Sequence, residues 1–190
     1  MDKKSIEQAV SVIIKAIGED PAREGLVGTP RRIAEMYEEL FAGLTQDPSQ
    51  LLETGFDDED HHEMVIVRDI PFTSLCEHHF LPFHGVAHVG YIPQGRILGV
   101  SKVARLVEML ARKPQVQERL TSQVADFLCQ GGLGAAGAGV VIEAEHSCMT
   151  ARGVKKPGSR VVTSATRGIF RDDPRTRAEF LSILEGRRSL

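Results

Sequence analysis

The chain has 190 residues, a length that fits one domain or one domain with a helical appendage. Hydrophobic residues make up 42% and charged residues 26%, the balance of a soluble globular protein. The formal net charge of -3 argues against a nucleic-acid-binding surface, and no apolar run is long enough to span a bilayer. The N-terminus lacks the features of a signal peptide and three cysteines give no disulfide framework, so we expect a cytoplasmic protein.

The N-terminal region, residues 1–60, is predicted to be helical and to end in an acidic loop. Apolar residues recur at helical spacing over 4–17. A second apolar face follows Thr29, which we interpret as an N-cap, and Pro30 in the first turn. Residues 45–62 combine proline, glycine and a run of acidic side chains, which predicts an exposed loop.

A second domain, over residues 61–190, is predicted to mix strands with helices. Ser101 is predicted to cap one of its helices and Pro114 to begin the next, and the glycine-rich stretch 131–139 predicts a flexible connection. The expected strands cover 64–72, 85–92, 97–100, 139–145 and 160–170, and the expected helices 101–110, 114–128 and the segment from 174. This order predicts an α+β fold with an antiparallel sheet that carries helices on one face.

Cysteine and histidine residues are concentrated in two short segments. Cys76 and His79 have the C-x-x-H spacing of a metal half-site, and the segment E-A-E-H-S-C supplies His146 and Cys148. Two thiolates and one imidazole leave a fourth position of tetrahedral zinc for water, the pattern of catalytic sites. The remaining imidazoles, those of His78 and His146, then suit proton transfer beside the metal. The alternative is that the cysteines are buried apolar thiols.

Two further clusters indicate anion and base recognition. Ser101, Lys102 and Arg105 lie at a predicted helix N-terminus, and Arg152 follows the second metal segment. Such cations in an acidic protein favour a phosphate ligand. Glu118 lies on a packing helix, and its carboxylate can accept two parallel hydrogen bonds, as the N–H edge of guanine offers. The alternative for both clusters is a solvated helix surface.

These segments occur together in an order that resembles GTP cyclohydrolase I. They are T-S-L-C-E-H-H-F, G-Y-I-P, G-V-S-K-V-A-R, R-K-P-Q-V-Q-E-R-L-T, E-A-E-H-S-C-M-T-A-R-G and T-S-A-T-R-G-I-F, and the likeness runs from about Glu24 to Phe180. The resemblance implies a tunnelling fold, in which sheets from several subunits close a barrel, and a homodecamer. It also implies a reaction: the imidazole ring of GTP is opened with formate release, and ribose rearrangement and ring closure give 7,8-dihydroneopterin triphosphate, the first step of tetrahydrofolate and pterin biosynthesis.

Carried over position by position, the resemblance implies three groups of site residues. The zinc ligands would be Cys76, His79 and Cys148, and proton transfer would fall to His78 and His146. The guanine would be held by Gln117 and Glu118, and the triphosphate with the nearby ribose by Ser101, Lys102, Arg105 and Arg152. The substrate pockets of the family lie at subunit interfaces, so we expect Arg105 of one chain to serve the zinc of a neighbour.

Two alternatives remain open from the residues. Another enzyme of the tunnelling fold is one: nitrile reductases use a cysteine nucleophile with NADPH, and pterin synthases use histidine-only zinc sites. The cysteine in E-H-S-C and the run C-E-H-H disfavour both. A nucleotide-sensing scaffold with a structural zinc is the other, and the presence of both His78 and His146 disfavours it.

Overall fold

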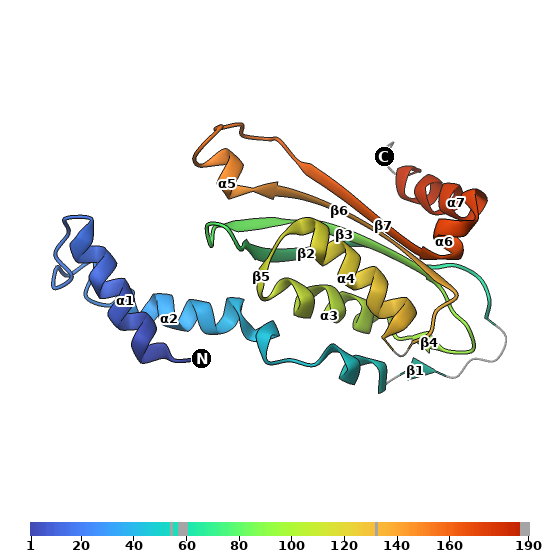
Figure 1. The fold of residues 1–190 in the computed structure, drawn as a ribbon, viewed down its shortest axis with the longest axis horizontal. Helices are drawn as coiled ribbons and strands as arrows, with labels where there is room; N and C mark the ends of the chain where they lie inside the picture. Colours follow the sequence, from blue (N-terminus) through green and yellow to red (C-terminus); the bar gives the residue numbers. More distant parts are fainter. Residues whose placement is uncertain (54, 57–60, 132, 187–190) are drawn as a thin grey trace.

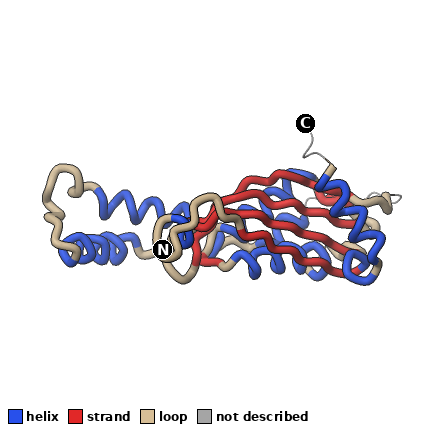
Figure 2. The backbone as a smooth tube through the Cα atoms, turned by 90° about the horizontal axis from the view of Figure 1, so that it is seen from above, coloured by secondary structure: helices blue, strands red, loops and turns tan. Residues whose placement is uncertain are grey.

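The computed structural model describes residues 1–53, 55–56, 61–131 and 133–186, and these form a mixed α+β fold. A curled five-stranded sheet carries two long helices beneath it, and a pair of N-terminal helices extends away from the sheet (Figures 1 and 2). No helix in the described part of the chain has both the length and the apolar character needed to cross a membrane.

The elements follow in the order expected from the sequence. The helices are α1 (Lys3–Ala16), α2 (Thr29–Leu40), η1 (Ala42–Leu44), η2 (Pro48–Glu53), α3 (Val100–Ala111), α4 (Gln117–Gln130), α5 (Ser147–Thr150), α6 (Ile169–Asp172) and α7 (Pro174–Glu185). The strands are β1 (Gly55–Phe56), β2 (Val65–Cys76), β3 (Pro82–Ile92), β4 (Ile97–Leu98), β5 (Pro114–Gln115), β6 (Gly137–His146) and β7 (Val161–Gly168).

The main sheet has the strand order β5-β2-β3-β6-β7, and its four long strands are antiparallel, as predicted. The short β5 adds a parallel pairing, Leu75 opposite Pro114 and Cys76 opposite Gln115. In the described residues β7 is an edge strand, and β2 pairs on its outer side only at its last two residues. Unpaired edges of this length usually need a cover or a partner strand.

The core lies between the sheet and helices α3 and α4. Strands β3 and β6 alternate, so that Phe83, Tyr91 and Ile142 point toward the helices and are fully buried with Leu106 and Leu120. Burial of each such side chain stabilises the fold by about 1.5–3 kcal/mol. The Tyr91 hydroxyl donates to the Leu98 carbonyl at 3.2 Å and accepts from its N–H at 3.0 Å, so this buried polar group is satisfied.

The expectation of helices on one face only is incomplete. Phe170 of α6 and Phe180 of α7 lie on the opposite face, above Gly90 and Gly139. A Cβ at Gly139 would lie 2.6 Å from the Phe170 ring, so glycine is needed for this close approach. The glycine-rich stretch is therefore not a flexible connection throughout, because β6 begins at Gly137.

Three predicted helix starts are wrong by one to three residues. Helix α2 is capped by Gly28 rather than Thr29, and α3 begins at Val100 after Gly99, so Ser101 lies inside the first turn. Pro114 does not begin a helix, because its strand pairing with β2 holds the chain extended until α4 starts at Gln117. The predicted loop 45–62 contains η2 and β1, and its acidic run at 57–60 lies outside the described residues.

Candidate active site

A group of two cysteines and one histidine lies at one end of the sheet. Cys76 ends β2, His79 lies in the β2–β3 turn and Cys148 lies in α5, and their ligand atoms all lie within 4.8 Å of one another. The sequence segments predicted to form a metal site are thus brought together. Two sulfurs and one imidazole form a soft donor set that suits zinc, whereas magnesium and calcium prefer oxygen ligands.

The β2–β3 turn places Cys76 and His79 on the same side. The Cys76 N–H donates to the Leu81 carbonyl at 2.9 Å, and the Phe80 N–H donates back to the Cys76 carbonyl at 2.8 Å. Phe80 has a φ of 52°, an unusual conformation for a non-glycine residue that closes the turn tightly. The side chains at 76 and 79 therefore converge.

An ion pair between Glu77 and Arg119 also stabilises the β2–β3 turn. Arg119 of α4 donates two hydrogen bonds to the Glu77 carboxylate, at 2.6 and 2.9 Å. These hydrogen bonds lower the pKa of Glu77, and the Glu77 N–H donates to the Gln115 carbonyl at 3.0 Å. The turn is therefore attached to both α4 and β5.

The end of β6 brings the second segment beside this turn. Phe83 lies opposite His146 in the β3–β6 register, which places Cys148, two residues further on, next to Cys76. Burial and the neighbouring Cys76 thiol raise the pKa of Cys148. A divalent cation would reverse this effect, because it stabilises both thiolates.

His146 is held from its face and from its edge. Its ring stacks on Phe83 with the centroids 4.6 Å apart and the planes at 2°. Its Nε2 atom lies 2.7 Å from Oε1 of Gln117. Burial lowers the pKa of His146, and the Glu118 carboxylate partly opposes this effect. Glu118 is therefore close enough to act on the same imidazole.

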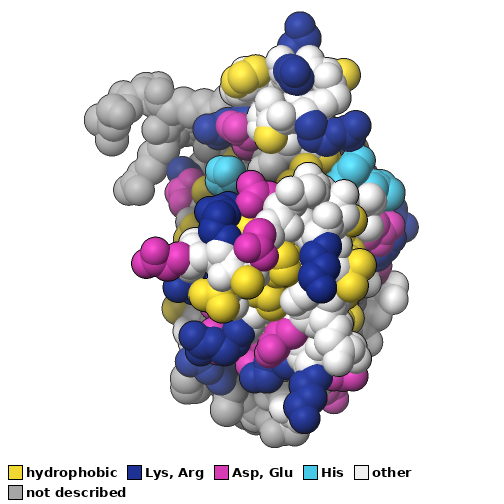
Figure 3. Space-filling model, turned by 90° about the vertical axis from the view of Figure 1, so that its left-hand side faces the viewer, with side chains coloured by type: hydrophobic (Ala, Val, Ile, Leu, Met, Phe, Trp, Pro, Cys, Tyr) yellow, Lys and Arg dark blue, Asp and Glu magenta, His cyan; other side chains and the backbone are white. Residues whose placement is uncertain are grey.

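His78 and Arg152 lie beside the candidate ligands. The Nδ1 atom of His78 is 3.6 Å from the sulfur of Cys76, and the His78 side chain is 64% exposed, so it is open to a substrate. The guanidinium of Arg152 lies 3.0 Å from Nε2 of His79. Figure 3 views this end of the molecule, where histidine side chains are exposed among basic, acidic and hydrophobic ones.

The chain matches the family model described as GTP cyclohydrolase I over residues 6–185. It belongs to the GTP cyclohydrolase I family. Proteins named GTP cyclohydrolase 1 from Dehalococcoides mccartyi and Halalkalibacterium halodurans are 58% and 60% identical to it, over 97% and 98% of both chains. One from Carboxydothermus hydrogenoformans is 60% identical over 97% of this chain and 95% of its own. Among solved structures, an archaeosine synthase QueF-like protein in the apo form overlaps with a TM-score of 0.46 and 16% identity, over 55% of this chain and 93% of its own.

Three of the site residues predicted from the resemblance to GTP cyclohydrolase I lie far in space from the candidate metal cluster. Ser101, Lys102 and Arg105 belong to the first half of α3, whose other end leads into β5 beside Cys76. At 1.5 Å per residue, Ser101 is about 15 Å along the axis from Ala111, the last residue of the helix. In Figure 1, β4 and the start of α3 lie at the right of the sheet, whereas β5 and α5 lie at the left.

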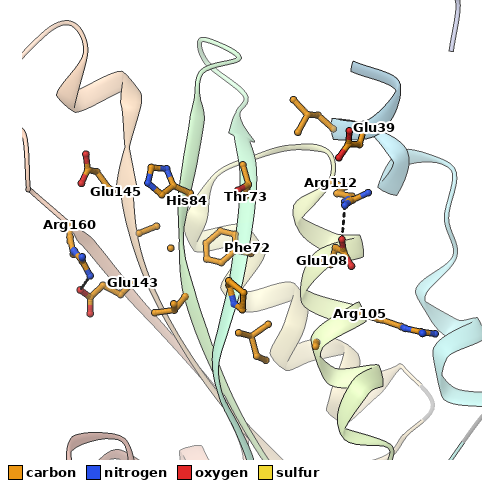
Figure 4. A pocket seen from close by; sticks show the side chains of 17 residues that line it. Glu39, Phe72, Thr73, His84, Arg105, Glu108, Arg112, Glu143, Glu145 and Arg160 are labelled. Carbon is orange, nitrogen blue, oxygen red and sulfur yellow. Dashed lines mark hydrogen bonds and ion pairs between the residues drawn. The ribbon is translucent and has the colours of Figure 1, made fainter. Parts of the chain in front are cut away.

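Arg105 contributes to a different feature, a cleft of about 840 Å³ beside the outer edge of β2. Thr73, His84 and Glu145 lie on its sheet side, and Arg105 of α3 and Arg112, which directly follows α3, lie on the other side (Figure 4). None of the three candidate metal ligands lines this cleft. The chemistry of the donor set, rather than the size of the cavity, therefore locates the candidate site of this GTP cyclohydrolase I family member.

Some contacts of the site were not foreseen from the sequence. The side chain of Gln117 is 1% exposed and contacts His146, Ile142, Val161 and Thr163, so it is engaged within the protein rather than directed at a ligand. The sequence also does not predict the stacking of Phe83 on His146 or the ion pair of Arg119 with Glu77 in the β2–β3 turn. The register between strands creates these contacts, and no local sequence signal reports it.

Proposed function

We propose that this protein is a GTP cyclohydrolase I. It opens the imidazole ring of GTP by hydrolysis, releases formate and forms 7,8-dihydroneopterin triphosphate, as the first step of tetrahydrofolate and pterin biosynthesis. The observation that carries the proposal is the cluster of Cys76, His79 and Cys148 beside His146. Family membership and relatives named GTP cyclohydrolase 1 at 58–60% identity support it.

The cluster would hold one zinc ion. Its three protein ligands would leave a position for a substrate or water, the arrangement of catalytic rather than structural zinc. When bound, zinc would supply Lewis-acid chemistry and activation of water near neutral pH. Cys76 and Cys148 would bind as thiolates and His79 as the neutral imidazole.

The proton steps fall to the two histidines that are not ligands. His146, which is held rigidly against Phe83, delivers a proton to the purine nitrogen beside carbon 8. The exposed His78 serves the later steps, since ring opening, ribose rearrangement and ring closure each move protons. Burial lowers the pKa of His146, so near neutral pH its ring is mainly neutral and must take up a proton before passing it on.

Guanine recognition is assigned to Glu118 at the start of α4. Its carboxylate influences His146, so it lies near the proposed position of the purine. A carboxylate pairs with two neighbouring N–H groups of guanine and has no such partner on adenine. The neighbouring Gln117 was expected to share this role, but its side-chain amide is already bonded within the protein.

The triphosphate is bound and not cleaved, so the basic residues act as a clamp. Arg152 lies at the metal end of its own chain, whereas Ser101, Lys102 and Arg105 lie toward the far end of α3. We therefore assign these three residues to the site of a neighbouring chain. Pairing of the β7 and β2 edges between subunits would close a tunnelling-fold barrel within a homodecamer and bring the two halves together.

The activity is tested by incubating purified protein with GTP, with formate and pterin fluorescence as readouts and zinc measured on the same sample. Stoichiometric formate and pterin with one zinc per chain is the expected result. Formate without a pterin would point to ring opening alone. Zinc binding without formate would favour the scaffold alternative and refute the proposed reaction.

A mixing experiment tests the shared site. Arg105→Ala and His146→Ala should each be nearly inactive. After joint unfolding and random co-assembly in equal amounts, about a quarter of the sites receive both intact residues if they come from two chains of a symmetric ring. The control mixes His146→Ala with Cys148→Ser, two residues from the same end of one chain, and should recover nothing. Absence of recovery in the first mixture would show that Arg105 and His146 do not come from different chains.

A further inference from the structure

The side-chain amide of Gln117 connects α4 to the sheet at the point where His146 leaves β6. Its Nε2 atom donates to the carbonyls of Ile142 at 3.0 Å and Val161 at 2.9 Å, and lies 3.1 Å from the hydroxyl of Thr163. Its Oε1 atom lies 2.7 Å from Nε2 of His146. A side chain that is 1% exposed thus has a partner at both ends of its amide.

These partners determine which way the amide points. Backbone carbonyls only accept hydrogen bonds, so Ile142 and Val161 require the NH₂ end of Gln117. A flipped amide would place an oxygen against both carbonyls, and two acceptors at this distance repel each other. The oxygen of Gln117 therefore faces His146, and because that oxygen only accepts, the Nε2 atom of His146 must carry a hydrogen.

We infer that Gln117 is a positioning residue that fixes His146 in the tautomer with hydrogen on Nε2, so that every proton exchanged with the substrate passes through Nδ1. Phe83 contributes the second constraint, since its ring stacks on the imidazole at 2° and limits rotation about the side chain. The inference rests on the proposed function of His146 in proton transfer. It explains why a polar side chain is buried here between α4, β6 and β7.

The matched control is another buried glutamine, two residues earlier in the chain. Gln115 is 0% exposed, and its Nε2 atom donates to the Leu110 carbonyl at 3.0 Å and to the Gln123 side chain at 2.9 Å. Gln115→Met and Gln117→Met therefore each remove a buried amide that donates to at least one backbone carbonyl. Only Gln117→Met removes the acceptor that faces His146.

The kinetic test compares kcat, KM for GTP, zinc content and melting temperature in the two variants. Groups that orient metal-ligating histidines through a hydrogen bond typically change activity on the order of 10- to 100-fold when removed, and Gln117 makes a comparable bond to the non-ligand His146. We expect such a fall in kcat in Gln117→Met alone, with zinc and KM close to those of the unmodified protein and similar melting temperatures in both variants. An equal fall in kcat in both variants, or a fall that follows zinc loss, would mean that Gln117 only joins α4 to the sheet.

A second measurement needs no substitution at Gln117. Nitrogen-15 NMR of zinc-loaded, histidine-labelled protein distinguishes the two imidazole tautomers, and the His146 signals are assigned by their disappearance in His146→Ala. Hydrogen on Nε2 is expected, and hydrogen on Nδ1 would overturn the inference. The result does not depend on turnover: if the protein formed no pterin, the proposed function would fail while the NMR spectrum would still decide the tautomer.

Discussion

Replacement of His146 by alanine separates proton transfer from metal binding. The substitution removes the stack on Phe83, which is worth about 0.5–1.5 kcal/mol beyond area burial, and leaves Oε1 of Gln117 without a donor, at a cost of about 1–3 kcal/mol. Together these losses amount to about 1.5–4.5 kcal/mol, below the roughly 5–15 kcal/mol that stabilises a typical domain. The variant should therefore fold.

Turnover should fall much more than stability. General acid–base catalysis typically contributes about 10²–10⁴-fold, and each tenfold step corresponds to about 1.36 kcal/mol of barrier. We expect kcat to fall within that range while zinc stays at one ion per chain, since His146 is outside the group of candidate ligands. The assay combines pterin fluorescence with metal analysis and a melting curve. Stoichiometric loss of zinc from the folded variant would refute the division of roles between His146 and the ligands.

Three further substitutions extend the test to the metal, the base and the fold. Cys148→Ser should lose both zinc and activity, and full activity of unmodified protein stripped of metal under reducing conditions would contradict this. Glu118→Gln should strongly weaken GTP turnover with zinc and assembly intact, whereas equal use of ATP and GTP by the unmodified protein would rule out its role in guanine binding. Gly85→Ala would place a Cβ 1.9 Å from the Glu143 carbonyl and push β3 from β6, so it should destabilise the fold by about 1–3 kcal/mol or more. Gly186→Ala, whose Cβ would lie 3.4 Å from its nearest neighbour, is the control, and equal melting temperatures would show that β3 and β6 tolerate the added methyl group.

Local sequence patterns predicted the element order and the convergence of Cys76 with His79 well, because both depend on short-range spacing. The alternation in β3 and β6 follows from the period of a strand, and the C-E-H-H turn follows from the three-residue separation of Cys76 and His79. Helix starts were less accurate. Ser101 resembles an N-cap, but Gly99 already turns the chain, and Pro114 resembles a first helical residue, but its pairing with β2 makes it a strand.

Contacts between distant elements were not predictable in the same way. Gln117 and His146 are 29 residues apart, and their contact depends on the crossing of α4 over β6 and β7. Likewise, Glu77 and Arg119 pair across 42 residues. Gln117 is next to Glu118 in the sequence, and the resemblance to the family predicts that both bind guanine. Only the three-dimensional arrangement reveals that Gln117 hydrogen-bonds to His146.

The direction of α3 has a consequence for the proposed activity. The helix leads from Gly99 toward β5, so its C-terminal end is next to Cys76, and Lys102 lies about 13 Å along the axis from that end. Metal binding would then need only one chain, since all three candidate ligands belong to the same end of one sheet. On the proposed function, phosphate binding by Lys102 would be a property of the assembly, because the start of α3 lies far from the Cys76 end of its own chain. Among the described residues, the β7 edge is free and the β2 edge is paired only at its last two residues. On the proposed function, these edges serve catalysis as well as assembly, because their pairing between subunits would bring together two half-sites that a single fold keeps apart.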